Sequence, residues 1–255
     1  LFLLLLFSSV NSSCQTHIVK WYDLKDFNIS GRSDTSETLP FQRLPENMRL
    51  NLRERVWELS QNSAGLYLDF KTNSSIVNVE YQVNDVKEFT HMPATGVSGL
   101  DLYSLDNNNE WKWARGNYNF GDTISYKFSG FKNDRFKTSK YFRLYLPLYN
   151  TLNWIKIGID GASGFEQLKT NGNEKPILIY GTSIVQGACA SRPGMAWTSL
   201  LGRKLNKPIV NLGFSGNGRL EPEIIDFISQ LDVSIYVLDC MANFTAGQGL
   251  GLDEA

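Results

Sequence analysis

The sequence predicts an α/β protein in two parts, a β-sandwich followed by a three-layer unit built on a parallel sheet. The first observation is that residues 19–160 consist of short apolar-polar alternations broken by Gly, Asn and Asp. The second is that residues 176–239 follow the order strand, helix, strand, helix, strand. Alternation with a period of two is typical of half-buried strands, whereas strands separated by helices form parallel sheets with right-handed crossovers.

We assign the sandwich to residues 19–172. Several strands at close spacing are typical of a jelly-roll-like sandwich, and we expect strands at residues 66–70, 76–81, 124–128, 141–146 and 154–159. Glycines and asparagines between Gly161 and Asn173 indicate a link to the second unit, which we assign to residues 173–255.

Two features of the sandwich point to surfaces rather than to catalysis. Trp111 and Trp113 lie on one face of an expected strand. They would either stack on sugars or pack in the core, which is the commoner fate of tryptophan in a sandwich. Asp101 lies between two leucines and would point away from them in an extended segment. We expect it to accept hydrogen bonds in a turn or between the two units.

The second unit begins with an apolar run at residues 176–180, which predicts a strand buried on both faces. Gly181 permits the sharp turn that follows. Residues 195–205 have apolar side chains at helical spacing, and residues 208–212 predict the next strand. A second amphipathic helix at residues 224–231 leads to a third strand at residues 233–239.

Each of the three predicted strands ends in a polar or glycine-rich loop, and these loops supply Ser183, Gly216 and Asn243. In an open parallel sheet the loops at the carboxyl ends of the strands converge on one crevice. The three residues therefore predict a serine nucleophile with an oxyanion hole, made by the N–H groups of Ser183 and Gly216 and the amide of Asn243. Losing one such donor costs about 10²–10³ in rate.

These loops have three other interpretations. Ser183 would simply cap the following helix if the tetrapeptide stood alone. The glycine spacing of residues 213–218 is wrong for a dinucleotide or phosphate-binding loop. The same segment almost forms the Gly-x-Ser-x-Gly elbow of α/β-hydrolases around Ser215, but Asn217 stands where the last glycine belongs.

Three segments resemble the first three blocks of the SGNH (GDSL-like) hydrolase superfamily, which contain Ser, Gly and Asn in that order. They are Gly181-Thr182-Ser183-Ile184, Gly213-Phe214-Ser215-Gly216-Asn217-Gly218 and Asp239-Cys240-Met241-Ala242-Asn243. Thr182 replaces the usual aspartate, and the third block lacks the usual Gly-x-Asn-Asp. Upstream, Gly99-Leu100-Asp101-Leu102-Tyr103 resembles the signature of the GxDLY β-sandwich, which precedes the esterase domain in one subgroup.

The resemblance implies a flavodoxin-like hydrolase domain and a serine esterase that cleaves acetyl or short acyl esters, with acetylated carbohydrate as the expected substrate. It implies no cofactor, and no His/Cys cluster has the spacing of a metal site. The alternative is a non-catalytic carbohydrate-binding surface protein with a decayed hydrolase domain. The family also requires a histidine in an Asp-x-x-His segment, which this sequence lacks. His17 and His91 are expected to be structural or exposed, and we expect a C-terminal truncation with an inactive fragment.

Composition indicates an exported protein with a near-neutral surface. The 255 residues have a formal net charge of −1, so nucleic acid is not an expected partner. Residues 1–18 predict a signal peptide whose basic start is missing, because the apolar run at residues 1–10 is followed by small polar residues. The run is too short to span a bilayer. Cys14 is a possible site of a lipid anchor, and the expected location is the bacterial periplasm, the cell surface or the medium. Cys189 and Cys240 are either a disulfide or two free thiols.

Overall fold

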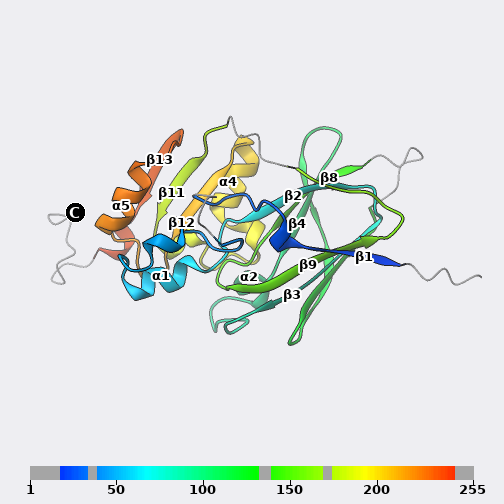
Figure 1. Ribbon diagram of the computed structural model, residues 1–255, viewed down its shortest axis with the longest axis horizontal. Helices are drawn as coiled ribbons and strands as arrows, with labels where there is room; N and C mark the ends of the chain where they lie inside the picture. Colours follow the sequence, from blue (N-terminus) through cyan, green and yellow to red (C-terminus); the bar gives the residue numbers. More distant parts are fainter. Residues whose placement is uncertain (1–17, 34–38, 132–138, 169–173, 245–255) are drawn as a thin grey trace, which may run out of the picture.

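The computed structural model describes residues 18–33, 39–131, 139–168 and 174–244. Cys14, His17 and the predicted signal peptide up to residue 17 lie outside the described residues, as does part of the predicted link at residues 169–173. Two lobes lie side by side along the long axis of the molecule, with the antiparallel strands in one and the parallel sheet in the other (Figure 1). The predicted α/β fold class is confirmed.

The antiparallel lobe is a sandwich of two sheets. The strand order is β1-β9-β3-β7-β6 in one sheet and β10-β2-β8-β4-β5 in the other. Apolar side chains at alternate positions, such as Val77, Val79 and Tyr81, point into the shared core. The bounds are β1 Val19–Asp23, β2 Tyr67–Thr72, β3 Ile76–Val83, β4 Asp101–Leu105, β5 Trp111–Ala114, β6 Gly116–Phe120, β7 Ile124–Ser129, β8 Lys140–Tyr145, β9 Leu152–Asp160 and β10 Phe165–Gln167.

The second lobe contains a parallel sheet in the order β12-β11-β13 (Ile209–Gly213, Ile177–Gly181, Ile235–Asp239). This order brings the carboxyl ends of all three strands together, with Gly181 in register with Gly213 and Asp239. β13 is an edge strand in the described residues, and its Ile235, Tyr236 and Leu238 are exposed.

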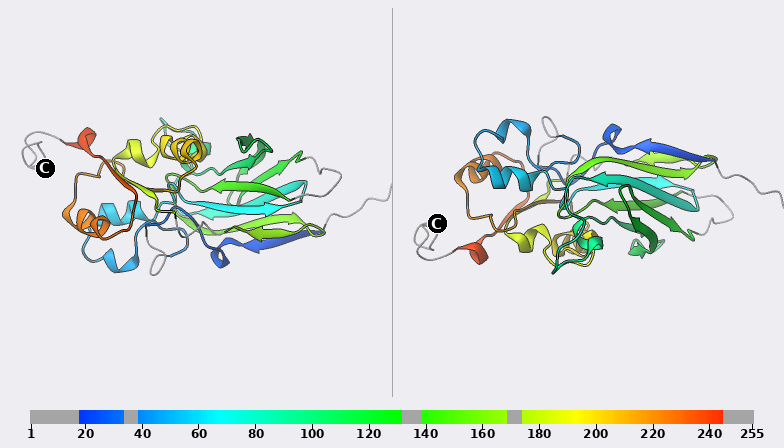
Figure 2. Two further views of the ribbon diagram at one scale, coloured as in Figure 1. Left: turned by 90° about the horizontal axis from the view of Figure 1, so that it is seen from above. Right: turned by 90° about the horizontal axis from the view of Figure 1, so that it is seen from below.

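Helices cover both faces of the parallel sheet (Figure 2). Trp197 and Leu201 of α4 (Trp197–Leu205) pack on one face, and Ile224 and Ile228 of α5 (Pro222–Ser229) pack on the other. The short helices are α2 (Ala94–Val97), α3 (Ser183–Gln186) and the 3₁₀ turns η1 (Leu24–Asp26), η2 (Glu46–Met48), η3 (Pro193–Met195) and η4 (Met241–Asn243).

One helix of this lobe comes from far upstream in the chain. Val56 and Leu59 of α1 (Glu54–Ser60) pack beside α5 on the parallel sheet, together with Leu44, Met48 and Leu52. The assignment of residues 19–172 to the sandwich stays a prediction. Within that range, residues 44–59 pack on the parallel sheet of the second lobe, where their apolar side chains cover one of its faces.

Arg43, just before this segment, is fully buried between the lobes. Its guanidinium donates to the carbonyl oxygens of Leu59, Asn62, Asn211 and Gly213, at 2.5, 2.9, 3.2 and 2.7 Å. Burial lowers the pKa of Arg43 to about 9, so the group remains charged at neutral pH. A cation that is held by carbonyl dipoles therefore joins the upstream segment to the end of β12.

The outer face of the β10-β2-β8-β4-β5 sheet packs against the second lobe through aromatic rings and arginines. Arg203 of α4 lies 3.9 Å from the ring centre of Tyr103. Within the sheet itself, Arg143 of β8 lies 4.9 Å from the ring centre of Trp111 of β5. Trp113 is 48% exposed, but Arg192 lies 4.3 Å from its ring centre. A guanidinium therefore lies over each of the two indole rings, where a stacked sugar was one of the two expectations.

No helix in the described ranges is both long enough and apolar enough to cross a membrane.

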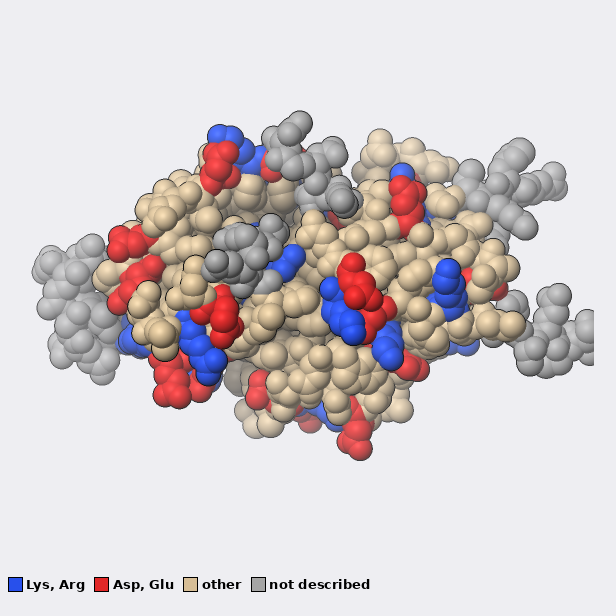
Figure 3. All heavy atoms as spheres, viewed as in Figure 1, with Lys and Arg blue, Asp and Glu red and all other residues tan. Residues whose placement is uncertain are grey.

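Cys189 is exposed and Cys240 is buried, and both are free thiols, so the disulfide alternative is wrong. Charges of both signs are interspersed over the face shown in Figure 3.

Candidate active site

Ser183 follows the sharp turn at the end of β11. Thr182 caps α3, because its Oγ1 accepts a hydrogen bond from the Ile184 amide at 3.4 Å. The capping role that was the alternative for Ser183 therefore belongs to its neighbour. Ser183 is partly exposed, and its hydroxyl makes no hydrogen bond within the part of the chain that the structure describes.

Glycines let the loops approach each other closely. A Cβ on Gly213 would overlap the Gln186 backbone, and a Cβ on Gly218 would overlap the Gly181 carbonyl. Gly218 also has a φ of +71°, which disfavours a side chain. The turn after β11 and the loop after β12 thus pack backbone against backbone.

Two backbone N–H groups at this junction are available as donors. The Ser183 N–H belongs to the first residue of α3, where a helix offers no internal acceptor. Gly216 is exposed, with a φ of +69° and open space around its Cα. Neither N–H has an acceptor among the described residues, whereas the Ser215 N–H donates to Gln186 Oε1 at 2.8 Å.

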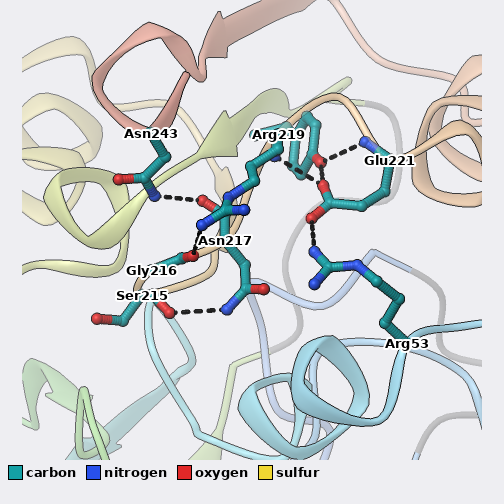
Figure 4. Close-up of polar contacts among 8 residues, drawn as sticks. Arg53, Ser215, Gly216, Asn217, Arg219, Glu221 and Asn243 are labelled. Carbon is teal, nitrogen blue, oxygen red and sulfur yellow. Dashed lines mark hydrogen bonds and ion pairs between the residues drawn. The ribbon is translucent and has the colours of Figure 1, made fainter. Parts of the chain in front are cut away.

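Asn243 lies in η4 after β13 and contacts the second loop (Figure 4). Its Nδ2 donates to the Asn217 carbonyl oxygen at 2.6 Å, and Asn217 Nδ2 donates to the Ser215 carbonyl oxygen at 2.9 Å. An amide nitrogen has two N–H groups, so one on Asn243 remains after this contact. The structure brings the loops of Gly216 and Asn243 together, and the catalytic roles of Ser183, Gly216 and Asn243 stay predictions.

Gln186 is a site residue that the sequence reasoning missed. It is fully buried, and its Nε2 donates to Asn62 Oδ1 and to the Leu148 carbonyl oxygen, each at 3.1 Å. Because its Oε1 holds the Ser215 N–H, it fixes the Gly216 loop against α3. The sequence did contain a signal for it: an amide side chain shortly after a fully apolar strand. When such an amide is buried, it needs several hydrogen-bond partners and so links neighbouring segments.

Tyr149 reaches the site from the chain between β8 and β9. Its hydroxyl donates to the Ser183 carbonyl oxygen at 3.3 Å. Burial raises the pKa of Tyr149 to about 12, so the hydroxyl keeps its proton at neutral pH. The sandwich lobe therefore supplies a donor that holds the start of α3.

Glu221 lies behind the second loop, at the start of α5 (Figure 4). Its carboxylate accepts hydrogen bonds from the Tyr180 hydroxyl, from the Arg219 N–H at 2.8 Å and from Arg53 at 2.5 Å. Burial alone would raise the pKa of Glu221, but the hydrogen bonds, that from Tyr180 first, outweigh burial and lower it. Arg219 in turn donates to the Gly216 carbonyl oxygen at 3.1 Å, so the network supports the loop of the predicted oxyanion hole.

His91 is exposed and stacks on Phe89 with ring centres 5.6 Å apart. No group of three His, Cys, Asp or Glu side chains in the described ranges is placed to hold a metal ion. The candidate residues Ser183, Gly216 and Asn243 offer a hydroxyl, backbone N–H groups and an amide, which suit the binding of a developing oxyanion.

Two family models match this chain. Residues 19–165 match the GxDLY model, described as the N-terminus of SGNH-hydrolase-type esterases. Residues 174–249 match the GDSL-like lipase/acylhydrolase family. No curated protein matches the chain.

Among solved structures, a protein from Bacteroides ovatus ATCC 8483 described as a GDSL-like lipase is 30% identical, with a TM-score of 0.81 over 89% of this chain. The salicylyl-acyltransferase SsfX3 from a tetracycline biosynthetic pathway is 17% identical, with a TM-score of 0.65 over 88% of this chain. This second likeness concerns the fold alone. The chain spans 65% and 62% of the lengths of these two proteins.

Proposed function

Because this chain belongs to the SGNH-hydrolase-type esterases that have a GxDLY N-terminal domain, we propose that it is a serine esterase. The observation that carries the proposal is the pair of N–H groups on Ser183 and Gly216 that have no acceptor among the described residues and lie on adjoining loops beside an unengaged serine hydroxyl. Backbone donors of this kind stabilise the oxyanion of acyl transfer.

In the proposed reaction, Ser183 Oγ attacks the ester carbonyl while a base accepts its proton. The negative charge on the carbonyl oxygen is held by the N–H groups of Ser183 and Gly216 and by the remaining N–H of Asn243. The C–O bond to the alcohol then breaks, the alcohol leaves with a proton, and water hydrolyses the acyl-enzyme. By the family resemblance the base is a histidine in an Asp-x-x-His segment, which residues 1–255 do not contain.

The proposed substrate is an acetyl or other short acyl ester on a carbohydrate, and the proposed location is outside the cytoplasm. Export is supported by the apolar segment at residues 1–10. The alternative, a carbohydrate-binding surface protein without catalysis, predicts glycan affinity and no hydrolysis.

The test uses the protein expressed from its complete gene, with 4-nitrophenyl acetate and acetylated xylan as substrates. We expect hydrolysis by the unaltered protein and a loss of at least about 10³-fold in kcat/KM for Ser183→Ala, because the nucleophile is removed while binding and the oxyanion hole remain. Ser229→Ala, on the exposed end of α5, is the matched control and should stay within about twofold.

Retention of full activity in Ser183→Ala would overturn the assignment. If Ser215→Ala were inactive in the same experiment, the nucleophile would lie in the second loop instead. Glycan binding without hydrolysis by the unaltered protein would favour the binding-protein alternative.

A further inference from the structure

A cavity lies where the two lobes meet, and its lining includes none of the loop residues assembled around Ser183. Its volume is about 470 Å³, within the range of about 300–1,000 Å³ that is typical of small-molecule sites. The sandwich contributes the start of β4, the turn between β5 and β6, and β7, and the second lobe contributes Ser191 and Arg192. Sites between structural units are a common place for ligands.

The wall formed by the second lobe is held in place. Thr95 of α2 donates to the Ser191 carbonyl oxygen at 2.7 Å, and a Cβ on Gly96 would overlap the Ala190 carbonyl. Asp101 accepts from Trp113 Nε1 at 2.7 Å and from the Gly194 N–H at 3.1 Å, and it pairs with Arg192 at 3.1 Å. These contacts fix the cavity from both lobes.

The charge of the lining favours an anion. Asp101 and Arg192 form an ion pair and neutralise each other, and the carboxylate of Asp101 also accepts two hydrogen bonds. Arg115 is the remaining charged group, and its guanidinium has no hydrogen bond or ion pair within the ranges the structure describes. A guanidinium binds a carboxylate through two parallel hydrogen bonds.

The remaining lining fits a hydroxylated ring. Tyr118 is 55% exposed and leans on Tyr126 with ring centres 5.3 Å apart, so part of its ring faces solvent. Ser191 also lines the cavity, and its hydroxyl makes no hydrogen bond to the described residues. Hydroxyl groups bind sugar hydroxyls, and an aromatic ring packs against the apolar face of a sugar.

We propose that this cavity binds a uronic acid, a sugar ring that bears a carboxylate, with Arg115 holding the carboxylate and Tyr118 packing on the ring. The site does not depend on hydrolysis by Ser183. A glycan bound there would lie between the two lobes, in contact with Ser191 and Arg192 of the segment that follows α3.

The test is isothermal titration calorimetry of the full-length protein with trigalacturonate, which has no ester bond, and with neutral galactotriose. We expect trigalacturonate to bind at least tenfold more tightly. Arg115→Ala should weaken trigalacturonate binding at least tenfold, and Arg115→Lys should restore part of it because a point charge replaces the planar group. Tyr118→Ala should weaken the binding of both sugars.

Arg49→Ala is the matched control, since Arg49 is an exposed arginine on the other lobe, and it should change nothing. Unfolding midpoints check that each variant is folded. Equal binding of trigalacturonate by Arg115→Ala, or no binding by the unaltered protein, would overturn the proposal. Salicylate binding as tight as that of trigalacturonate would also overturn it, in favour of aromatic acids.

The outcome is separable from that of the esterase proposal. Ser183→Ala should bind trigalacturonate unchanged, and Arg115→Ala should hydrolyse 4-nitrophenyl acetate at the unaltered rate. Loss of trigalacturonate binding in Ser183→Ala would place the sugar at Ser183 and refute a separate site.

Discussion

Asp101 ties the two lobes together at the scale of a single residue. The residue is 1% exposed, and its carboxylate accepts hydrogen bonds from Trp113 in the sandwich and from Gly194 in the second lobe. This contact between the lobes is the role expected for it from the sequence. Burial raises the pKa of Asp101 to about 6, and the nearby positive charge of Arg192 limits this rise.

A pH dependence of stability follows from Asp101. Its pKa is higher in the folded protein than in the unfolded chain, so the folded state binds the extra proton between about pH 4 and 6. The stability that this group contributes is therefore fully present below its unfolded pKa of 3.8 and is lost, by about 3 kcal/mol in all, as pH rises through the folded pKa of about 6. Urea unfolding of the unaltered protein and of Asp101→Asn at pH 4, 5, 6 and 7 measures this difference. A constant gap between the two proteins would contradict the prediction.

At the scale of elements, the site depends on three strand-end loops that pack backbone against backbone. Gln186 and Tyr149 hold the first loop, Arg219 and Gln186 hold the second, and Asn243 joins the third to the second. Each loop is fixed by a hydrogen bond from another element, so the N–H groups proposed as oxyanion donors are held in place. Such preorganisation is what makes oxyanion stabilisation effective.

The two glycines with positive φ in the second loop should respond differently to alanine. Gly218→Ala combines a strained φ with overlap on the Gly181 carbonyl, and should cost about 3–5 kcal/mol in the free energy of unfolding. Gly216→Ala meets open space and should cost only about 1–2 kcal/mol while keeping its N–H. Chemical denaturation of both variants checks this, and equal losses would show that the loop is not packed as described.

At the scale of the whole molecule, residues 39–62 integrate the two lobes. The segment leaves the sandwich, covers one face of the parallel sheet with α1 and returns to β2. Arg43 anchors it to the end of β12, directly before the loop that contains Gly216. The predicted active-site loop is therefore supported from the upstream half of the chain.

Arg43→Ala should destabilise the protein by about 3–5 kcal/mol, because four buried carbonyl oxygens lose their donor. Arg43→Lys keeps the charge but not the planar guanidinium, so its free energy of unfolding should lie between those of the unaltered protein and Arg43→Ala. Hydrogen exchange should show the largest loss of protection around residues 211–213. A loss below about 1 kcal/mol in Arg43→Ala would mean that this buried cation does not join the lobes.

The sequence by itself determined the fold class, the order strand, helix, strand, helix, strand of residues 176–239, and the three loops that contain Ser183, Gly216 and Asn243. These follow from local periodicity and turn residues, which a chain expresses wherever it is folded. Boundaries agreed to within about two residues for most predicted strands, because the apolar pattern marks which face is buried.

Only the tertiary structure decided which distant residues meet. The helix over the parallel sheet, the buried Arg43, the Gln186 network and the pairing of Asp101 with Arg192 join segments separated by many residues. Thr182 rather than Ser183 caps α3, and the two cysteines do not pair. The physical reason is that hydrogen bonding and burial of a polar side chain depend on its neighbours in space, which periodicity along the chain does not encode.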